Sequence, residues 1–136
     1  MSDSGAGGAE ETKLVKVLED LRSLSGEVDA GYVVSAEGRL LASTVKDTPE
    51  VDRDRLGAML SALAGLSERR ASERGHERAE QVRVRAPEGY VLLSPLSGGS
   101  VLAATTGPEA RVGLVLYDMR NARAEVERAL SEGRRR

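Results

Sequence analysis

Residues 56–71 have the sequence LGAMLSALAGLSERRA, which is typical of a helix that packs on two sides. Its large apolar residues recur at intervals of three and four and form one ridge, made of Leu56, Met59, Leu60, Leu63 and Leu66. Small residues form the adjoining stripe, made of Gly57, Ala58, Ser61, Ala62 and Gly65. Because small side chains let another backbone approach closely, this stripe predicts either a second helix or a close seat on the protein's own sheet. The pattern favours a second helix, and therefore association rather than catalysis.

Strand patterns lie on both sides of this helix. Before it, AGYVVS (residues 30–35) and RLLAST (39–44) are joined by a short loop that contains glycine, which predicts a β-hairpin. After it, residues 81–86, 90–96 and 100–106 follow one another across two tight turns and predict a three-strand meander. In the first of these strands valines alternate with arginines, so one face of the strand is expected to be buried.

Amphipathic helices are expected at the two ends of the chain. One runs from Glu10 to Ser25, and the other begins with a capping box formed by Thr106 and Glu109 and keeps an apolar face as far as Leu130. We expect a disordered tail over residues 1–9, a single domain over 10–131 and a basic tail over 132–136. The order α-β-β-α-β-β-β-α predicts an α+β fold, a five-stranded antiparallel sheet with the outer helices on one face and the middle helix on the other.

Composition excludes several classes of function. The chain has 136 residues and a formal net charge of −2, without the basic excess that nucleic-acid binding requires. It contains no phenylalanine, tryptophan or cysteine, so the core must be aliphatic, and neither stacking on bases nor disulfides are expected. No signal peptide and no run of about 20 apolar residues is evident. We therefore expect a cytoplasmic protein that does not insert into membranes.

The sequence offers no clear catalytic, metal or cofactor motif. His76, the single histidine, lies among charged residues and is best interpreted as a solvated surface group. No phosphate-binding glycine loop is present, and Ser43 and Lys46 match only a weak S-x-x-K pattern. We therefore expect no enzyme activity, no cofactor and no metal site. A module that senses a small molecule between helix and sheet remains the alternative function.

Over about residues 14–130 the chain resembles the roadblock family, the dynein light-chain-like regulators of Ras-type GTPases. The resemblance is carried by GYVVSAEGRLLAST (31–44), the helix quoted above, YVLLSPLSGGSVLAATT (90–106) and VGLVLYDMRNA (112–122). None of these segments is a catalytic signature, and the specificity lies in their order and spacing. The chain is similar to the short single-domain bacterial members.

The resemblance implies a roadblock/profilin-like fold and a homodimer. In such a dimer the strands at residues 81–86 pair across a two-fold axis, and the helices at residues 56–70 lie side by side. An open strand edge and the small-residue stripe agree with this arrangement. The implied dimer-interface residues are Gly57, Ser61, Ala62, Gly65, Gln81, Val82, Arg83, Val84 and Arg85.

The resemblance also implies a small Ras-like GTPase as the partner, which the protein would regulate, scaffold or activate. Four arginines on the middle helix are the candidate contacts, namely Arg53, Arg55, Arg69 and Arg70. An arginine inserted into the GTPase site is not expected, because surface arginine is the ordinary state and family members more often move the GTPase's own residues.

Overall fold

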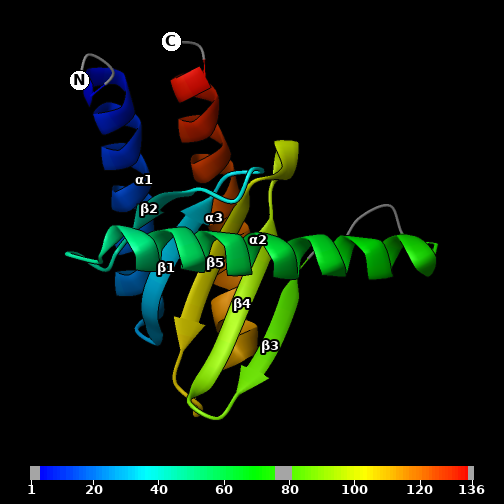
Figure 1. The fold of residues 1–136 in the computed structure, drawn as a ribbon. Coiled ribbons are helices and arrows are strands. Elements are labelled where there is room, and N and C mark those ends of the chain that lie inside the picture. The colour runs from blue at the N-terminus through cyan, green and yellow to red at the C-terminus, as the bar shows by residue number, and fades with distance from the viewer. Residues whose placement is uncertain (1–3, 76–80, 135–136) are drawn as a thin grey trace.

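The computed structural model describes residues 4–75 and 81–134, which form one five-stranded sheet and its covering helices (Figure 1). The elements follow the predicted order, and the predicted α+β class is confirmed. They are α1 (Ser4–Ser25), β1 (Val28–Val34), β2 (Leu40–Ser43), α2 (Glu50–Glu73), β3 (Val82–Ala86), β4 (Gly89–Pro95), the short 3-10 turn η1 (Ser97–Gly99), β5 (Val101–Thr106) and α3 (Val112–Arg134).

The sheet has the strand order β2-β1-β5-β4-β3, and every neighbouring pair is antiparallel. The predicted hairpin is β1 with β2, where Tyr32 pairs with Ser43. The predicted meander is β3, β4 and β5, where Val84 pairs with Val91. This order leaves β2 and β3 as the two edge strands.

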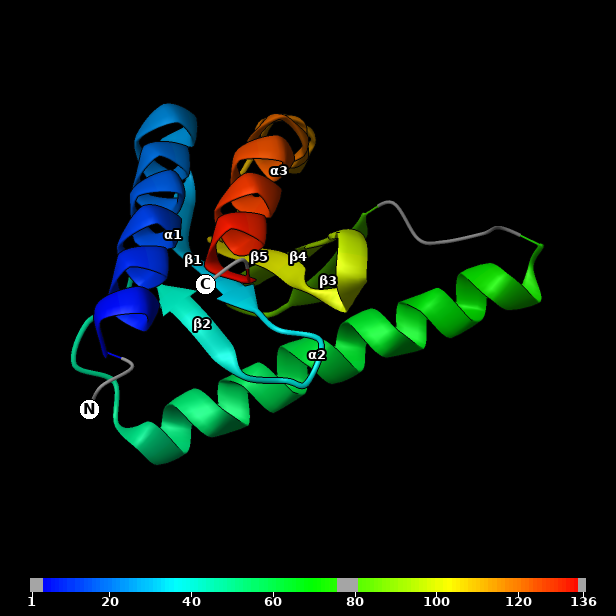
Figure 2. The ribbon, with the colours of Figure 1, turned by 90° about the horizontal axis from the view of Figure 1, so that it is seen from above.

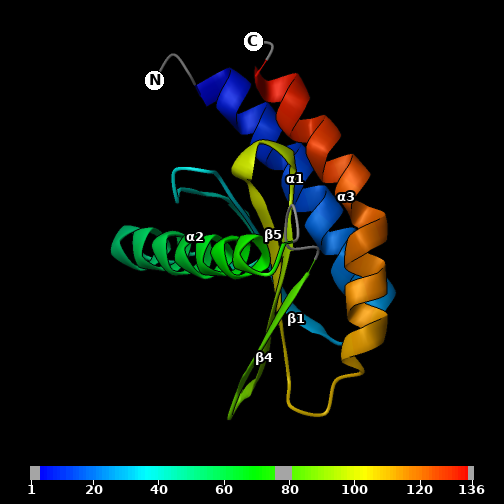
Figure 3. The ribbon, with the colours of Figure 1, turned by 90° about the vertical axis from the view of Figure 1, so that its right-hand side faces the viewer.

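Helices cover both faces of the sheet, as predicted. Figure 3 shows α1 and α3 on one face and α2 on the other. The first face carries the larger core, in which Leu18 and Met119 pack over Leu102. The second face carries a smaller core, in which Leu60 and Ala64 of α2 pack over the sheet. Both cores consist mainly of aliphatic side chains because the chain has few aromatic ones.

The two expected tails are shorter than predicted. Helix α1 already begins at Ser4, so the disordered tail is wrong from residue 4 onward, and α3 continues to Arg134, so residues 132–134 are helical. The ends of the two helices support each other. Lys13 Nζ lies 2.6 Å from Glu132 Oε1, and Gly133 lies so close to the Glu10 side chain that a Cβ there would overlap it. Residues 1–3 and 135–136 lie outside the described residues.

Two predicted helix ends are also corrected. Helix α3 begins at Val112 rather than near Thr106, because residues 107–110 form a turn and the Glu27 carboxylate accepts hydrogen bonds from the main chain and side chain of Arg111. The charged residues 68–78 predict a second half of the middle helix that projects into water, but α2 ends at Glu73. Gly75, with φ +87°, follows this end, and residues 76–80, including His76, lie outside the described residues.

Candidate functional site

Helix α2 is poorly buried for its length. Of its 24 residues, all within the described part of the chain, Gly57, Leu60 and Ala64 are buried. Three large apolar residues instead face solvent: the exposed fractions are 61% for Val51, 55% for Met59 and 51% for Leu66. Helical periodicity groups these three with two exposed alanines. We call this surface the outer stripe of α2; it consists of Val51, Ala58, Met59, Ala62 and Leu66.

The helix also extends beyond its own sheet. Figures 1 and 2 show the C-terminal part of α2 projecting past β3, the last strand of the sheet. An unpaired strand edge and a projecting helix with an apolar outer stripe therefore lie next to each other. Both features are typical of a surface that associates with another chain.

Side chains of β3 alternate as predicted. Val82 packs against the core beneath α2, whereas Arg83 and Arg85 are exposed. The guanidinium of Arg85 lies 5.8 Å from the centre of the Tyr90 ring. Gln81, just before the strand, donates from Nε2 to the main-chain oxygen of Leu116 at 2.7 Å. Of the predicted interface residues, Gln81 is therefore already tied to α3.

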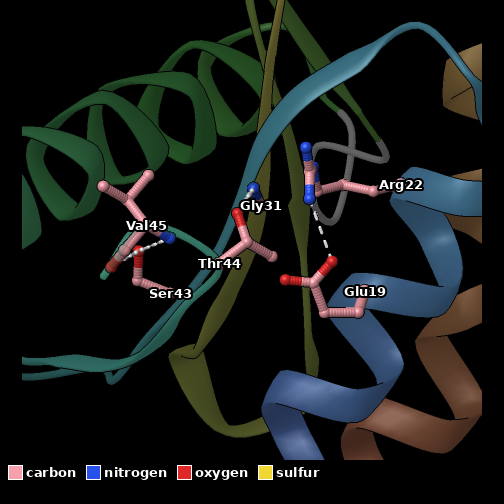
Figure 4. A network of polar contacts seen from close by, with 6 residues as sticks. All are labelled: Glu19, Arg22, Gly31, Ser43, Thr44 and Val45. Atoms are coloured by element: carbon pink, nitrogen blue, oxygen red, sulfur yellow. Dashed lines mark hydrogen bonds and ion pairs between the residues drawn. The ribbon is translucent and has the colours of Figure 1, made fainter.

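The other edge strand, β2, is held by contacts within the chain. Arg53 Nη2 on α2 donates to the main-chain oxygen of Leu40 at 3.3 Å. Figure 4 shows how the end of β2 is fixed: Thr44 Oγ1 accepts a hydrogen bond of 3.0 Å from the main-chain N–H of Gly31. Within residues 4–75 and 81–134, the edge strand β2 therefore has a main-chain oxygen that is already bonded to α2.

The small-residue stripe of α2 is divided between three surroundings. Gly57 lies under the β1–β2 turn, where a Cβ would overlap the carbonyl oxygen of Gly38 and lie 3.1 Å from the nitrogen of Leu40. At this position the small residue lets α2 pack closely on the protein's own sheet, which was the alternative to packing against a second helix. Gly57 is therefore not accessible to a second helix. Ala62 points to solvent, and Gly65 lines a cavity described below.

The four candidate arginines also differ. Arg53, predicted as a contact for a partner, is half-buried, and its guanidinium donates a hydrogen bond to the main-chain oxygen of Leu40. Arg55 is exposed and lies 3.9 Å from Asp52, one turn earlier in the helix. Arg69 and Arg70 are exposed near the projecting end of α2. Three of the four arginines are therefore exposed, whereas Arg53 is half-buried.

The weak S-x-x-K match has a structural use. Ser43 Oγ accepts a hydrogen bond of 2.9 Å from the main-chain N–H of Val45, which closes a local turn after β2 (Figure 4). Within residues 4–75 and 81–134, no cluster of three or more histidine, aspartate or glutamate side chains is arranged to hold a metal ion. None of the helices in those residues has the length and apolar composition needed to span a bilayer.

Three side chains have pKa values that are shifted by hydrogen bonds or burial within the fold. Hydrogen bonds from Arg111 lower the pKa of Glu27, and a hydrogen bond from the main-chain N–H of Ser97 lowers the pKa of Glu127 on α3. Burial beneath α2 raises the pKa of Tyr32. These groups lie outside the outer stripe of α2.

A cavity of about 220 Å³ lies between α2 and two turns at one end of the sheet. Its polar lining comes from Ser61 and Glu68 on α2 and from Ser100 before β5. Sequence reasoning missed this cavity because its walls come from separate segments that only the fold brings together. Its volume is below the roughly 300–1,000 Å³ of typical small-molecule sites, so it gives little support to the ligand-sensing alternative.

Comparison with known proteins gives matches over most of the chain. Residues 14–106 match the model of the Roadblock/LC7 domain family. An uncharacterized protein of Methanocaldococcus jannaschii is 30% identical over 117 residues, which cover 86% of this chain and 96% of that protein.

Two solved structures share the fold. MglB of Myxococcus xanthus superposes with a TM-score of 0.76 at 16% identity, covering 90% of both chains. A Roadblock/LC7 domain from Streptomyces avermitilis superposes with a TM-score of 0.75 at 20% identity, covering 85% of this chain and 96% of that one. At these identities the structural likeness shows the fold alone, whereas the sequence match extends over more than half of the chain. The chain belongs to the Roadblock/LC7 domain family.

Proposed function

We propose that this protein is a homodimeric, non-catalytic regulator or scaffold that binds a small Ras-like GTPase in the cytoplasm. The observation that carries the proposal is the low burial of α2, a 24-residue helix of which three residues are buried. Its outer stripe would leave Val51, Met59 and Leu66 more than half exposed in a monomer. Apolar surface grouped in this way is stabilised when a second chain removes it from water.

The dimer that we propose joins two copies through β3 and α2. Pairing of the two β3 strands across a two-fold axis would extend the sheet and remove an open edge. The projecting ends of α2 would then each lie beside the partner copy, and the two outer stripes would meet. Ala58 and Ala62 within the stripe would let the helices approach closely, which is the role first expected of the whole small-residue stripe.

A Ras-like GTPase is proposed as the partner because the resemblance to roadblock proteins implies one. Arg55 lies on the face of the outer stripe, between Val51 and Met59, and Arg69 continues that face beyond Leu66, with Arg70 beside it. The dimer would therefore carry basic groups within and at the end of the stripe. Exposed charges of this kind raise the rate of association with an acidic partner and help to select it. Arg53 is left out of the proposed contact because it already bonds to Leu40.

Light scattering of the purified chain, alone and with the small GTPase encoded nearest to its gene, tests the proposal. The GTPase is loaded in turn with GDP and with a GTP analogue. We expect a dimer that binds the GTP form in preference. A variant with Arg55→Glu and Arg69→Glu should bind more weakly, whereas Arg128→Glu, on the opposite layer, should bind normally. A monomer that binds neither form would contradict the proposal.

A further inference from the structure

A groove runs between α1 and α3, which lie side by side on the face of the sheet opposite α2 (Figures 2 and 3). Two hollows of about 150 and 200 Å³ lie between these helices and share Val17, Asp20 and Glu125, so they form one groove. On α1 its lining runs from Lys13 to Leu24, a length of about 16 Å or three helical turns. We call it the α1–α3 groove.

The two ends of this groove differ in charge. Near the end of α1 and the start of α3, the charged residues of the lining are all acidic, namely Asp20, Asp118 and Glu125. At the other end the lining carries both signs, because it includes Lys13, Lys16 and Arg128 as well as acidic residues. The first end, which we call the acidic end, is therefore the part of the groove that attracts cations.

Two carboxylates of the acidic end have no partner in the part of the chain that the structure describes. Asp20 lies 3.5 Å from Lys16 in an exposed ion pair. Asp118 and Glu125, by contrast, make no side-chain hydrogen bond or ion pair with the described residues. Their charges are uncompensated within the chain, so a cationic group of another molecule can pair with them without displacing an existing contact.

Exposed apolar side chains gather at the same end. Leu24 lines the groove together with Asp118 and Asn121, and it is 71% exposed. On α3, Tyr117 lies one helical turn before Asn121 and is 60% exposed, and Leu114, one turn earlier still, is 53% exposed. Apolar surface grouped in this way is stabilised when another chain removes it from water.

We propose that the α1–α3 groove binds a basic amphipathic helix of a protein partner. A groove between two packed helices receives the side-chain ridge of a third helix. A helix bound in this way presents apolar anchors three and four residues apart, and three turns of groove accommodate such a set. Basic residues beside the anchors would face Asp118 and Glu125, and this charge complementarity selects the partner. The same carboxylates would repel an anionic membrane surface.

This inference does not depend on the proposed GTPase. The α1–α3 groove and the outer stripe of α2 lie in opposite layers of the fold (Figure 3). The two partners would therefore not compete, and the protein would join a basic helix on one side to a GTPase on the other.

The first test uses a synthetic amphipathic peptide of about three helical turns, with leucines spaced three and four residues apart and lysines beside them. One control peptide has glutamate in place of each lysine, and another has the same residues in shuffled order. We expect the lysine peptide to shift the amide resonances of Leu24, Asn121 and Ala122 in the isotopically labelled protein several-fold more than either control does. Equal shifts with the shuffled peptide would overturn the proposal.

Charge-matched variants then locate the binding surface. Asp118→Asn combined with Glu125→Gln removes both free carboxylates while keeping their shape, and it should weaken binding of the lysine peptide at least tenfold. The control combines Glu50→Gln with Asp54→Asn, two exposed acidic residues of α2, and changes the net charge equally. The control should bind the peptide like the wild type. Wild-type affinity in the first double variant would refute the proposal.

Two further measurements test other occupants of the groove. In sedimentation equilibrium, the Asp118→Asn, Glu125→Gln variant should form the same assembly as the wild type. A smaller assembly would assign the groove to a second copy of this chain and overturn the proposal, as would tighter binding to phosphatidylglycerol vesicles than to the lysine peptide. This variant should also bind the GTPase like the wild type, so that failure of GTPase binding and failure of peptide binding are separate results.

Discussion

The guanidinium of Arg53 on α2 donates a hydrogen bond to the main-chain oxygen of Leu40 on β2, with an N···O distance of 3.3 Å. Leu40 belongs to an edge strand, where outward carbonyl groups have no neighbouring strand to pair with. The contact thus gives one edge a partner from the same chain. In the dimer that we propose, the other edge, β3, is the one on which a second chain adds a strand.

Replacing Arg53 with methionine removes this hydrogen bond and keeps most of the aliphatic packing. We expect the free energy of unfolding to fall by about 1 kcal/mol, below the roughly 1.5–3 kcal/mol typical of hydrogen bonds to charged groups, because Arg53 is half-buried. Urea unfolding measures the change. Arg55→Met is the matched control, since an exposed ion pair such as that with Asp52 contributes about 0–1 kcal/mol. Equal losses in the two variants would show that the Leu40 contact adds nothing specific.

Replacing either of two glycines of α2 with alanine should change the free energy of unfolding, but in opposite directions. Gly57→Ala forces α2 away from Gly38 and should lower the free energy of unfolding by about 1–3 kcal/mol. Gly65→Ala adds a methyl group to open space and should raise it by up to about 1 kcal/mol. Thermal and urea unfolding of both variants measure the difference. Destabilisation by Gly65→Ala would show that the space beside it is not open in solution.

The order of elements was predictable from the sequence because each element has a local signal. Apolar residues three and four apart marked the helices, and alternation such as that of Val82, Arg83 and Val84 marked a strand. The helix starts that were wrong have no such local signal. Ser4 begins α1 without any periodic apolar residue, and α3 begins where Glu27, 84 residues before Arg111, accepts a hydrogen bond from that residue's main chain.

The candidate site was predictable only as a helix face. Spacing alone identified the small residues of α2, but it could not tell which of them are buried by the protein itself. Gly57 is buried because Gly38, from another element, approaches it closely. Arg53 shows the same limit, since its bond to Leu40 depends on how α2 crosses the sheet. Periodicity locates a surface, whereas tertiary contacts decide which of its residues remain available.

Acid should destabilise the protein in part through Glu127. Its Oε2 accepts a hydrogen bond of 2.9 Å from the main-chain N–H of Ser97, the chief cause of its lowered pKa. A carboxylate with a lowered pKa stabilises the fold above its unfolded value, near 4.5, and this contribution is lost as pH falls through the folded pKa.

Glu127→Gln should therefore be less stable than the wild type at pH 7 and should lose less stability below pH 4.5. Urea unfolding at a series of pH values gives the two curves. Glu125→Gln, an exposed change on the same helix, is the control and should follow the wild-type curve. Parallel curves for Glu127→Gln and the wild type would show that Glu127 does not contribute to the loss of stability in acid.

A glutamate in the outer stripe of α2 should dissociate the proposed dimer without unfolding the chain. Met59 is 55% exposed, so Met59→Glu should cost a monomer little, whereas in a dimer two buried carboxylates would face each other across the axis. We expect the dissociation constant to rise at least a hundredfold in sedimentation equilibrium. Leu114→Glu is the matched control, because Leu114 is 53% exposed on α3, in the opposite layer. If both variants dimerise like the wild type, α2 is not in the interface; if only Leu114→Glu dissociates, the α1–α3 layer forms it instead.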